Sequence, residues 1–121
     1  MGSAKHNAKA WSGGRYAVFT QRLIDAVLGE SGRTSGEVRR AVLARAARPG
    51  LSADGLTAPL GRYVDTVARH AYKVTDGDVA ELQRGGSSDD VLFEVTVAAA
   101  LGAALGRLER GLAALRGEEP D

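Results

Sequence analysis

The chain contains no cysteine among its 121 residues. This absence excludes disulfides, cysteine-bound zinc and any thiol nucleophile. Aromatic residues account for only 5% of the sequence, so a hydrophobic core has to be built from Ala, Leu and Val. Because these side chains are small, we expect the elements of the fold to approach one another closely.

Long hydrophobic runs are also missing. The most apolar stretch, Val91 to Gly106, has 16 residues and includes Glu94, whereas a membrane-spanning helix needs about 20 apolar residues. The first fifteen residues hold no apolar segment of signal-peptide length. We therefore predict a soluble, cytoplasmic protein with no membrane span.

Charge is nearly balanced overall but divided along the chain. The net charge is +1; residues 1–50 carry nine Lys/Arg and three Asp/Glu (+6), and residues 51–121 carry seven and twelve (−5). Two interpretations remain open. Solvated helix faces can simply differ in composition, or the basic half can attract an acidic partner or the acidic half of another subunit.

The length and the apolar fraction of 44% indicate one globular domain. We expect a flexible N-terminal tail over residues 1–14, a helical domain over 15–116 and an acidic tail over 117–121. Trp11 is the one residue of the first tail expected to anchor in a core.

Apolar residues recur at helical spacing in five segments, and neither a strand alternation nor a fixed-period repeat is present. The segments are Tyr16–Gly29, Ser35–Ala47, Pro59–Lys73, Asp76–Arg84 and Ser88–Arg116. We therefore predict an all-α helical bundle of about five helices with a long C-terminal helix.

Capping residues and small residues add detail to this prediction. Thr34 with Glu37 forms a capping-box pattern before the second segment, and Thr75 is placed to cap the fourth. Ala98, Gly102 and Gly106 recur every four residues on one side of the last segment. That flat side indicates close helix packing, either within the subunit or between subunits.

The stretch from Val64 to Leu115 combines a short helix, the Gly85-Gly86 break, a capped restart at residues 87–90 and a long Ala/Gly/Leu-rich helix. This order resembles the alkylhydroperoxidase D and carboxymuconolactone decarboxylase family. The resemblance implies an AhpD-like all-α fold, in which relatives are often trimers or hexamers.

The chemistry of that family's redox members is missing here. They carry a Cys-x-x-Cys-x-x-x-His motif with an upstream glutamate; the matching positions hold Ala71, Val74 and Asp78, and Pro59 lies near the glutamate position. Since Ala and Val cannot act as nucleophiles, thiol peroxidase activity is excluded. Nothing in the sequence implies a cofactor.

Several titratable residues surround the lost motif. Three are candidates for acid–base catalysis: His70, Asp78 and Glu94. Each also has a structural interpretation: a surface or helix-end histidine, an N-terminal cap shared by Asp76 and Asp78, and a buried Glu94 paired with Arg62 or Arg69. Three further residues are candidates for binding an anionic ligand: Arg69, Tyr72 and Lys73.

Motifs for metal or nucleotide chemistry are lacking. The sequence contains no HExxH, P-loop, GxGxxG or nucleophile elbow, so no metal site is predicted.

Arginines line the expected outer side of the second helix: Arg39, Arg40, Arg45 and Arg48. They suit phosphate contacts, but the near-zero net charge and the lack of a recognition-helix pattern argue against nucleic-acid binding.

Three classes of function therefore remain. The first, which we favour, is a non-catalytic AhpD-like protein that forms homo-oligomers through helix packing and binds a protein partner or a small ligand. The second is a cysteine-free decarboxylase, lyase or isomerase acting on a small carboxylic acid, with His70 as base. The third is a binder of nucleic acid or of an acidic partner through the Arg-rich N-terminal half.

Overall fold

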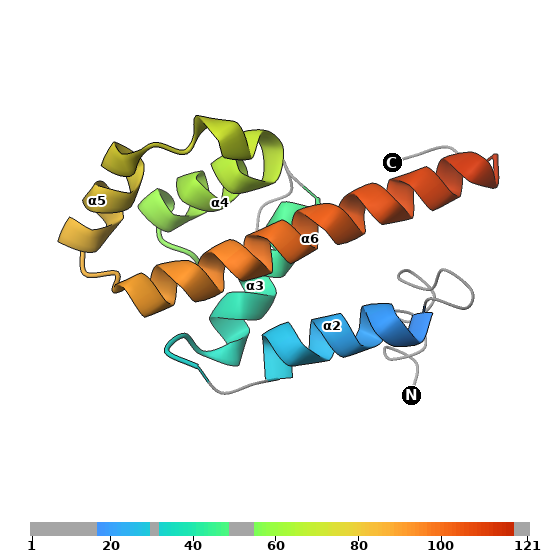
Figure 1. Cartoon of the computed structure of the whole chain (residues 1–121), viewed down its shortest axis with the longest axis horizontal. Coiled ribbons are helices and arrows are strands. Elements are labelled where there is room, and N and C mark those ends of the chain that lie inside the picture. The colour runs from blue at the N-terminus through green and yellow to red at the C-terminus, as the bar shows by residue number, and fades with distance from the viewer. Residues whose placement is uncertain (1–16, 30–31, 49–54, 118–121) are drawn as a thin grey trace.

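The fold is entirely helical over the residues that the structure describes. The computed structural model covers residues 17–29, 32–48 and 55–117. Its elements are α2 (Ala17–Gly29), α3 (Gly36–Ala47), α4 (Ala58–His70), a 3₁₀ turn η2 (Ala71–Lys73), α5 (Asp76–Arg84) and α6 (Asp89–Leu115) (Figure 1). The all-α prediction is thus confirmed. The expected tail over 1–14, with Trp11, and residues 118–121 of the expected tail over 117–121 lie outside the described residues.

Helix α6 is the central helix of the fold. It is 27 residues long, which corresponds to about 40 Å, and it packs against α2, α3 and α4. In Figure 1 it runs the length of the structure, with α4 and α5 on one side, α2 on the other, and α3 crossing it. The core is correspondingly built where α3, α4 and α6 meet.

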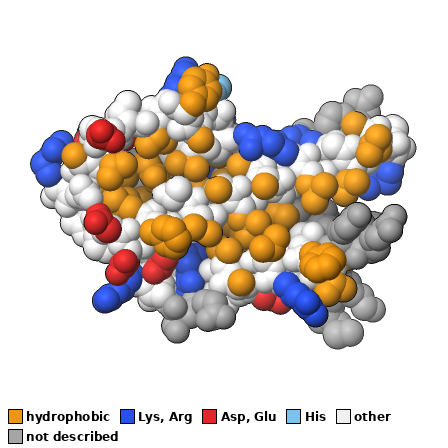
Figure 2. Space-filling model, in the orientation of Figure 1, with side chains coloured by type: hydrophobic (Ala, Val, Ile, Leu, Met, Phe, Trp, Pro, Cys, Tyr) orange, Lys and Arg blue, Asp and Glu red, His pale blue; other side chains and the backbone are white. Residues whose placement is uncertain are grey.

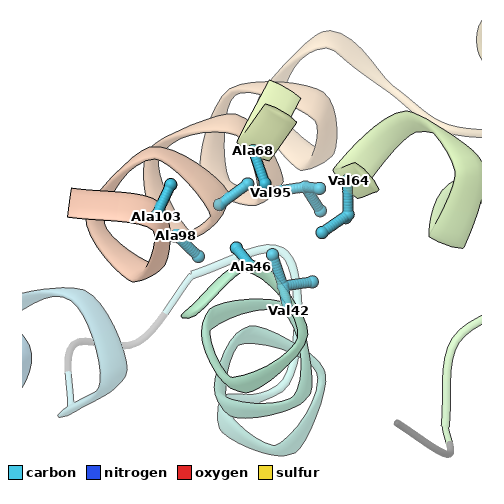
Figure 3. Packing of buried hydrophobic residues seen from close by; sticks show 8 residues of the cluster. Val42, Ala46, Val64, Ala68, Val95, Ala98 and Ala103 are labelled. Atoms are coloured by element: carbon cyan, nitrogen blue, oxygen red, sulfur yellow. The ribbon is translucent and has the colours of Figure 1, made fainter. Parts of the chain in front are cut away.

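Small aliphatic side chains fill that core, as the shortage of aromatics predicts. The buried cluster comprises Val42, Ala46, Val64, Ala68, Val95, Ala98, Ala99 and Ala103. In Figure 3 the labelled members converge from α3, α4 and α6. Helices that meet through alanine and valine must lie close together, and the contact between α3 and α6 is the closest.

The side of α6 that carries the small residues faces α3. A Cβ atom added at Gly102 would collide with the Leu43 carbonyl oxygen, and one at Gly106 would collide with the Ala47 carbonyl oxygen. The two backbones are therefore in direct contact. Of the two interpretations of this small-residue side, the structure favours packing within the subunit.

The restart between α5 and α6 agrees with the sequence in detail. Thr75 accepts a hydrogen bond from the Asp78 N–H (3.1 Å), while the Asp78 carboxylate accepts one from the Thr75 N–H (3.0 Å), so a capping box begins α5. Gly86, with φ of 107°, then turns the chain. Ser88 caps α6 by accepting from the Val91 N–H.

The predicted cap of α3 is wrong by one residue. Ser35, not Thr34, is the N-cap, and its hydroxyl accepts from the Val38 N–H. No capping box with Glu37 forms, because the Thr34 hydroxyl donates instead to Glu94 on α6. The predicted helix over 59–73 likewise divides into α4 and the 3₁₀ turn η2.

Two of the arginines expected on the outer side of α3 point into the fold. Arg39 is only 6% exposed and donates to the Val27 carbonyl oxygen at 3.1 Å. Arg45 is partly buried and holds both oxygens of Asp65, at 2.8 and 2.9 Å. Of the four arginines considered for phosphate contacts, only Arg40 and Arg48 then remain on the outer side of α3.

Several apolar residues expected in the core are exposed. On α6, Leu108 is 42% exposed and Leu115 is 85% exposed. On α2, Phe19 and Leu23 are 63% and 56% exposed, and Ile24 is the one apolar residue of this helix that is buried. The described helices therefore do not cover all of the apolar surface that the sequence supplies.

Candidate functional site

A hollow lined by three arginines lies where α3, α4 and α6 come together. It has a volume of about 280 Å³ and is lined by Ala46, Ala68, Arg69, His70, Ala103, Arg107 and Arg110. We call it the basic hollow. Its cationic side chains come from the end of α4 and from α6, and its alanines come from all three helices.

Two of these arginines are held in place by helix ends. Arg107 donates to the Ala68 carbonyl oxygen of α4 at 2.7 Å, and Arg110 donates to the Ala47 carbonyl oxygen of α3 at 3.2 Å. Both carbonyls belong to the last turn of a helix, where backbone acceptors lack helical partners and the dipole favours a cation. The two guanidinium groups are thus anchored beside the hollow.

The nearest carboxylates are already paired with other arginines. Asp65, one turn before Arg69 on α4, is held by Arg45, and hydrogen bonds from Arg45, followed by the smaller influence of Arg69, keep the Asp65 pKa below its ordinary value. Glu109 pairs with Arg48 at 3.1 Å. No carboxylate lines the hollow itself among the described residues.

A second hollow lies between α4 and α5 and has mixed charge. Its volume is about 210 Å³, and its lining comprises Pro59, Arg62, Tyr63, Thr66, Asp78, Glu81 and Leu82. Asp78 is occupied by the capping box, and the Tyr63 hydroxyl is hydrogen-bonded to Thr96 Oγ1 at 2.7 Å. Two of its polar groups therefore already serve the fold.

Glu94 binds the chain segment that leads into α3. Its carboxylate accepts from the Arg33 N–H (2.8 Å), the Thr34 N–H (2.9 Å) and the Thr34 hydroxyl (2.6 Å). These hydrogen bonds, with Thr34 contributing most, lower its pKa from 4.5 to about 2. The expected pairing with Arg62 or Arg69 is wrong, and Glu94 stays ionised at neutral pH.

The other two candidates, Tyr72 and Lys73, lie on η2, directly after α4. Tyr72 is 81% exposed. Its ring packs edge-on against the His70 ring, with 5.9 Å between the two ring centres, and Lys73 Nζ lies 6.0 Å from the centre of the Tyr72 ring. Neither Tyr72 nor Lys73 lines the basic hollow.

Of the six residues singled out in the sequence, the structure brings only Arg69 and His70 together in one hollow. Asp78 lines the other hollow, and Glu94 lines neither. Sequence reasoning missed Arg107 and Arg110 as members of a site. Their spacing of three residues on one helix face was the available signal.

Among the described residues, no group of three or more His, Asp or Glu side chains is placed to hold a metal ion.

A second feature is an apolar face on α6 that no described element covers. It consists of Phe93, Val97, Ala100, Ala104, Leu108 and Leu115, which we call the apolar stripe. Phe93 is 69% exposed. Figure 2 shows hydrophobic side chains gathered along α6 and continuing towards α2.

Helix α6 is also long and apolar enough to cross a membrane, by length and composition alone; 44% of its most apolar window is buried inside the fold. The core helix of a soluble protein has the same properties, so the predicted absence of a membrane span stays a prediction.

The chain was compared with models of protein families, with curated proteins and with solved structures, and none of them matches it.

Proposed function

We propose that the protein is a non-catalytic helical module that assembles with a second copy of itself through the apolar stripe of α6. The observation that carries this proposal is the stripe itself: one face of the longest described helix, from Phe93 to Leu115, is apolar and open to solvent. Contiguous apolar surface of this kind marks interaction sites in soluble proteins.

The order of side chains in the stripe suits an isologous contact, in which the same patch of both subunits pairs with itself. If two α6 helices run antiparallel and cross near Ala100, Phe93 of each copy lies opposite Leu108 of the other. Val97 then lies opposite Ala104. Bulky residues thus meet at the ends of the contact, and small residues at its centre allow close approach.

Charge favours the same antiparallel orientation. Helix α6 begins with Asp89 and Asp90 and carries Arg107, Arg110 and Arg116 towards its end. An antiparallel pair brings opposite charges and opposite helix dipoles together, whereas a parallel pair would bring like charges together. This argues for a second copy of the chain as the occupant of the stripe.

The relation to the alkylhydroperoxidase D and carboxymuconolactone decarboxylase family is part of the proposal. It is supported by the α5–Gly86–α6 unit, with its caps at Thr75 and Ser88. The oligomers known among such relatives agree with self-assembly. The missing motif positions, Ala71 and Val74 among them, agree with the absence of catalysis.

A substitution in the stripe tests the assembly. We expect the chain to run as a dimer, at twice its mass of 12.6 kDa, and Phe93→Glu to run as a monomer, because the carboxylate would be desolvated without a partner. The dimer Kd should rise about 100-fold or more, equivalent to roughly 3 kcal/mol. Size-exclusion chromatography with light scattering, over a concentration series, measures both.

Tyr72→Glu is the matched control, because Tyr72 is also an exposed aromatic residue but lies on η2, away from the stripe. It should remain a dimer. A monomeric parent chain, or a Phe93→Glu variant that stays dimeric, would contradict the proposal. Binding of the parent chain to neutral lipid vesicles with loss of that binding in Phe93→Glu would assign the stripe to a membrane instead.

The catalytic alternative has one supporting observation, the presence of His70 and Arg69 in the basic hollow. In it, His70 would act as base and Arg69 would hold a small carboxylic acid. Asp78 and Glu94 are engaged in capping and loop contacts elsewhere, so His70 would act without them. Unchanged turnover in His70→Ala would dismiss this alternative.

A further inference from the structure

We propose that the basic hollow binds a small phosphate monoester as its dianion. The site is formed by Arg69, Arg107 and Arg110 around a floor of alanines. In Figure 2, Lys and Arg side chains gather beside α6 next to the end of α4. The site shares no residue with the apolar stripe, so its test is separate from the test of the proposed self-assembly.

The charge of the hollow favours a dianion over a monoanion. Three guanidinium groups supply three positive charges, and no described carboxylate lines the hollow. The ends of α3 and α4 each contribute about −0.5 charge, which leaves a net charge of roughly +2. A phosphate monoester is close to a dianion at neutral pH, since its second pKa is about 6.

The anchoring of the arginines prepares them for such a ligand. Each guanidinium has five N–H donors, and the contacts to Ala68 and Ala47 each use one. The remaining donors of Arg107 and Arg110 are free to bind phosphate oxygens, and a planar fork suits this geometry. Because the side chains are already held, little conformational entropy is lost on binding.

The size and floor of the hollow restrict the rest of the ligand. Its volume of about 280 Å³ is just below the range of ligand pockets, roughly 300–1,000 Å³. Ala46, Ala68 and Ala103 offer a small apolar surface beneath the cations. The hollow therefore suits a phosphate on a short, partly apolar body, with His70 as an additional polar contact at its edge.

The experiment is a calorimetric titration of the full chain with methyl phosphate at pH 7.5, beside acetate at the same ionic strength. We expect saturable binding of one equivalent of methyl phosphate, at least tenfold tighter than acetate. Arg69→Gln should weaken binding at least tenfold. Arg69 is chosen because Arg107 and Arg110 also hold helix ends, so their loss would disturb the fold.

Arg62→Gln is the matched control: it removes the same charge from the same helix but outside the basic hollow. It should change the affinity less than twofold. Equal weakening by both variants, equal affinity for acetate, or no saturation would overturn the proposal. Vesicles containing phosphatidic acid are titrated in parallel, and binding to them without a response to methyl phosphate would overturn the assignment to a small molecule.

Discussion

Replacing Gly106 by alanine is expected to lower the free energy of unfolding by about 2–3 kcal/mol, the cost of forcing extra atoms into a packed core. Intrinsic helix propensity predicts the opposite sign, since alanine is favoured over glycine by about 1 kcal/mol in a helix interior. Packing decides the outcome here, because the new Cβ atom would collide with the Ala47 carbonyl oxygen of α3. Helices α3 and α6 would have to separate, and the core cluster between them would loosen.

Gly111→Ala provides the control in the same helix. A Cβ atom at Gly111 would have no neighbour within 4 Å, so only propensity acts, and the variant should gain up to about 1 kcal/mol. Urea unfolding followed by circular dichroism measures both variants. If Gly106→Ala proved as stable as the parent chain, α6 and α3 could not pack as closely as described. Gly102→Ala, which meets the Leu43 carbonyl oxygen, should behave like Gly106→Ala.

Glu94→Gln is expected to cost about 1–2 kcal/mol at pH 7, since it replaces hydrogen bonds to a charged acceptor in a partly exposed site. The single oxygen of the Gln amide can still accept a hydrogen bond. The NH₂ group that replaces the other carboxylate oxygen would face a backbone N–H, which needs an acceptor. The segment before α3 would lose its link to α6, and α2, which precedes that segment, would be held less firmly.

The pH dependence gives this prediction a distinct signature. The Glu94 pKa is about 2 in the folded protein against 4.5 for the ordinary group. Its stabilising contribution is therefore complete above about pH 4.5 and is lost as pH falls towards 2. The difference in unfolding free energy between the parent chain and Glu94→Gln should shrink over that range. Urea unfolding at several pH values measures it.

Glu81→Gln serves as the control for Glu94→Gln, because Glu81 is an exposed carboxylate on α5. Its stability should stay within about 0.5 kcal/mol of the parent chain, with the same pH dependence. A constant difference between the parent chain and Glu94→Gln from pH 7 to pH 2 would show that the carboxylate charge does not hold the segment before α3.

The sequence predicted best those features that depend on neighbouring residues. The cap of α5 at Thr75, the break at Gly85-Gly86 and the capped restart within residues 87–90 each involve residues within a few positions of one another. Their hydrogen bonds follow from local geometry. The whole α5–α6 unit could therefore be predicted nearly to the residue.

Contacts between distant segments could not be predicted in this way. Thr34 and Glu94 are 60 positions apart, and nothing near Thr34 distinguishes a hydroxyl that caps α3 from one that binds α6. The basic hollow depends similarly on Arg107 reaching Ala68 and Arg110 reaching Ala47, across 39 and 63 positions. Helical periodicity also identifies apolar positions without showing which of them, such as Leu108 and Leu115, remain uncovered.

The central position of α6 has a consequence for the synthesis of the protein. Helices α2, α3 and α4 all pack on α6, yet the ribosome makes them first. Until α6 emerges, Val42 and Val64, which are fully buried in the finished fold, lack the α6 side chains of their cluster and remain accessible to chaperones. Folding must then join segments about 60 residues apart, a loop closure that makes it slower than in bundles assembled from neighbouring helices.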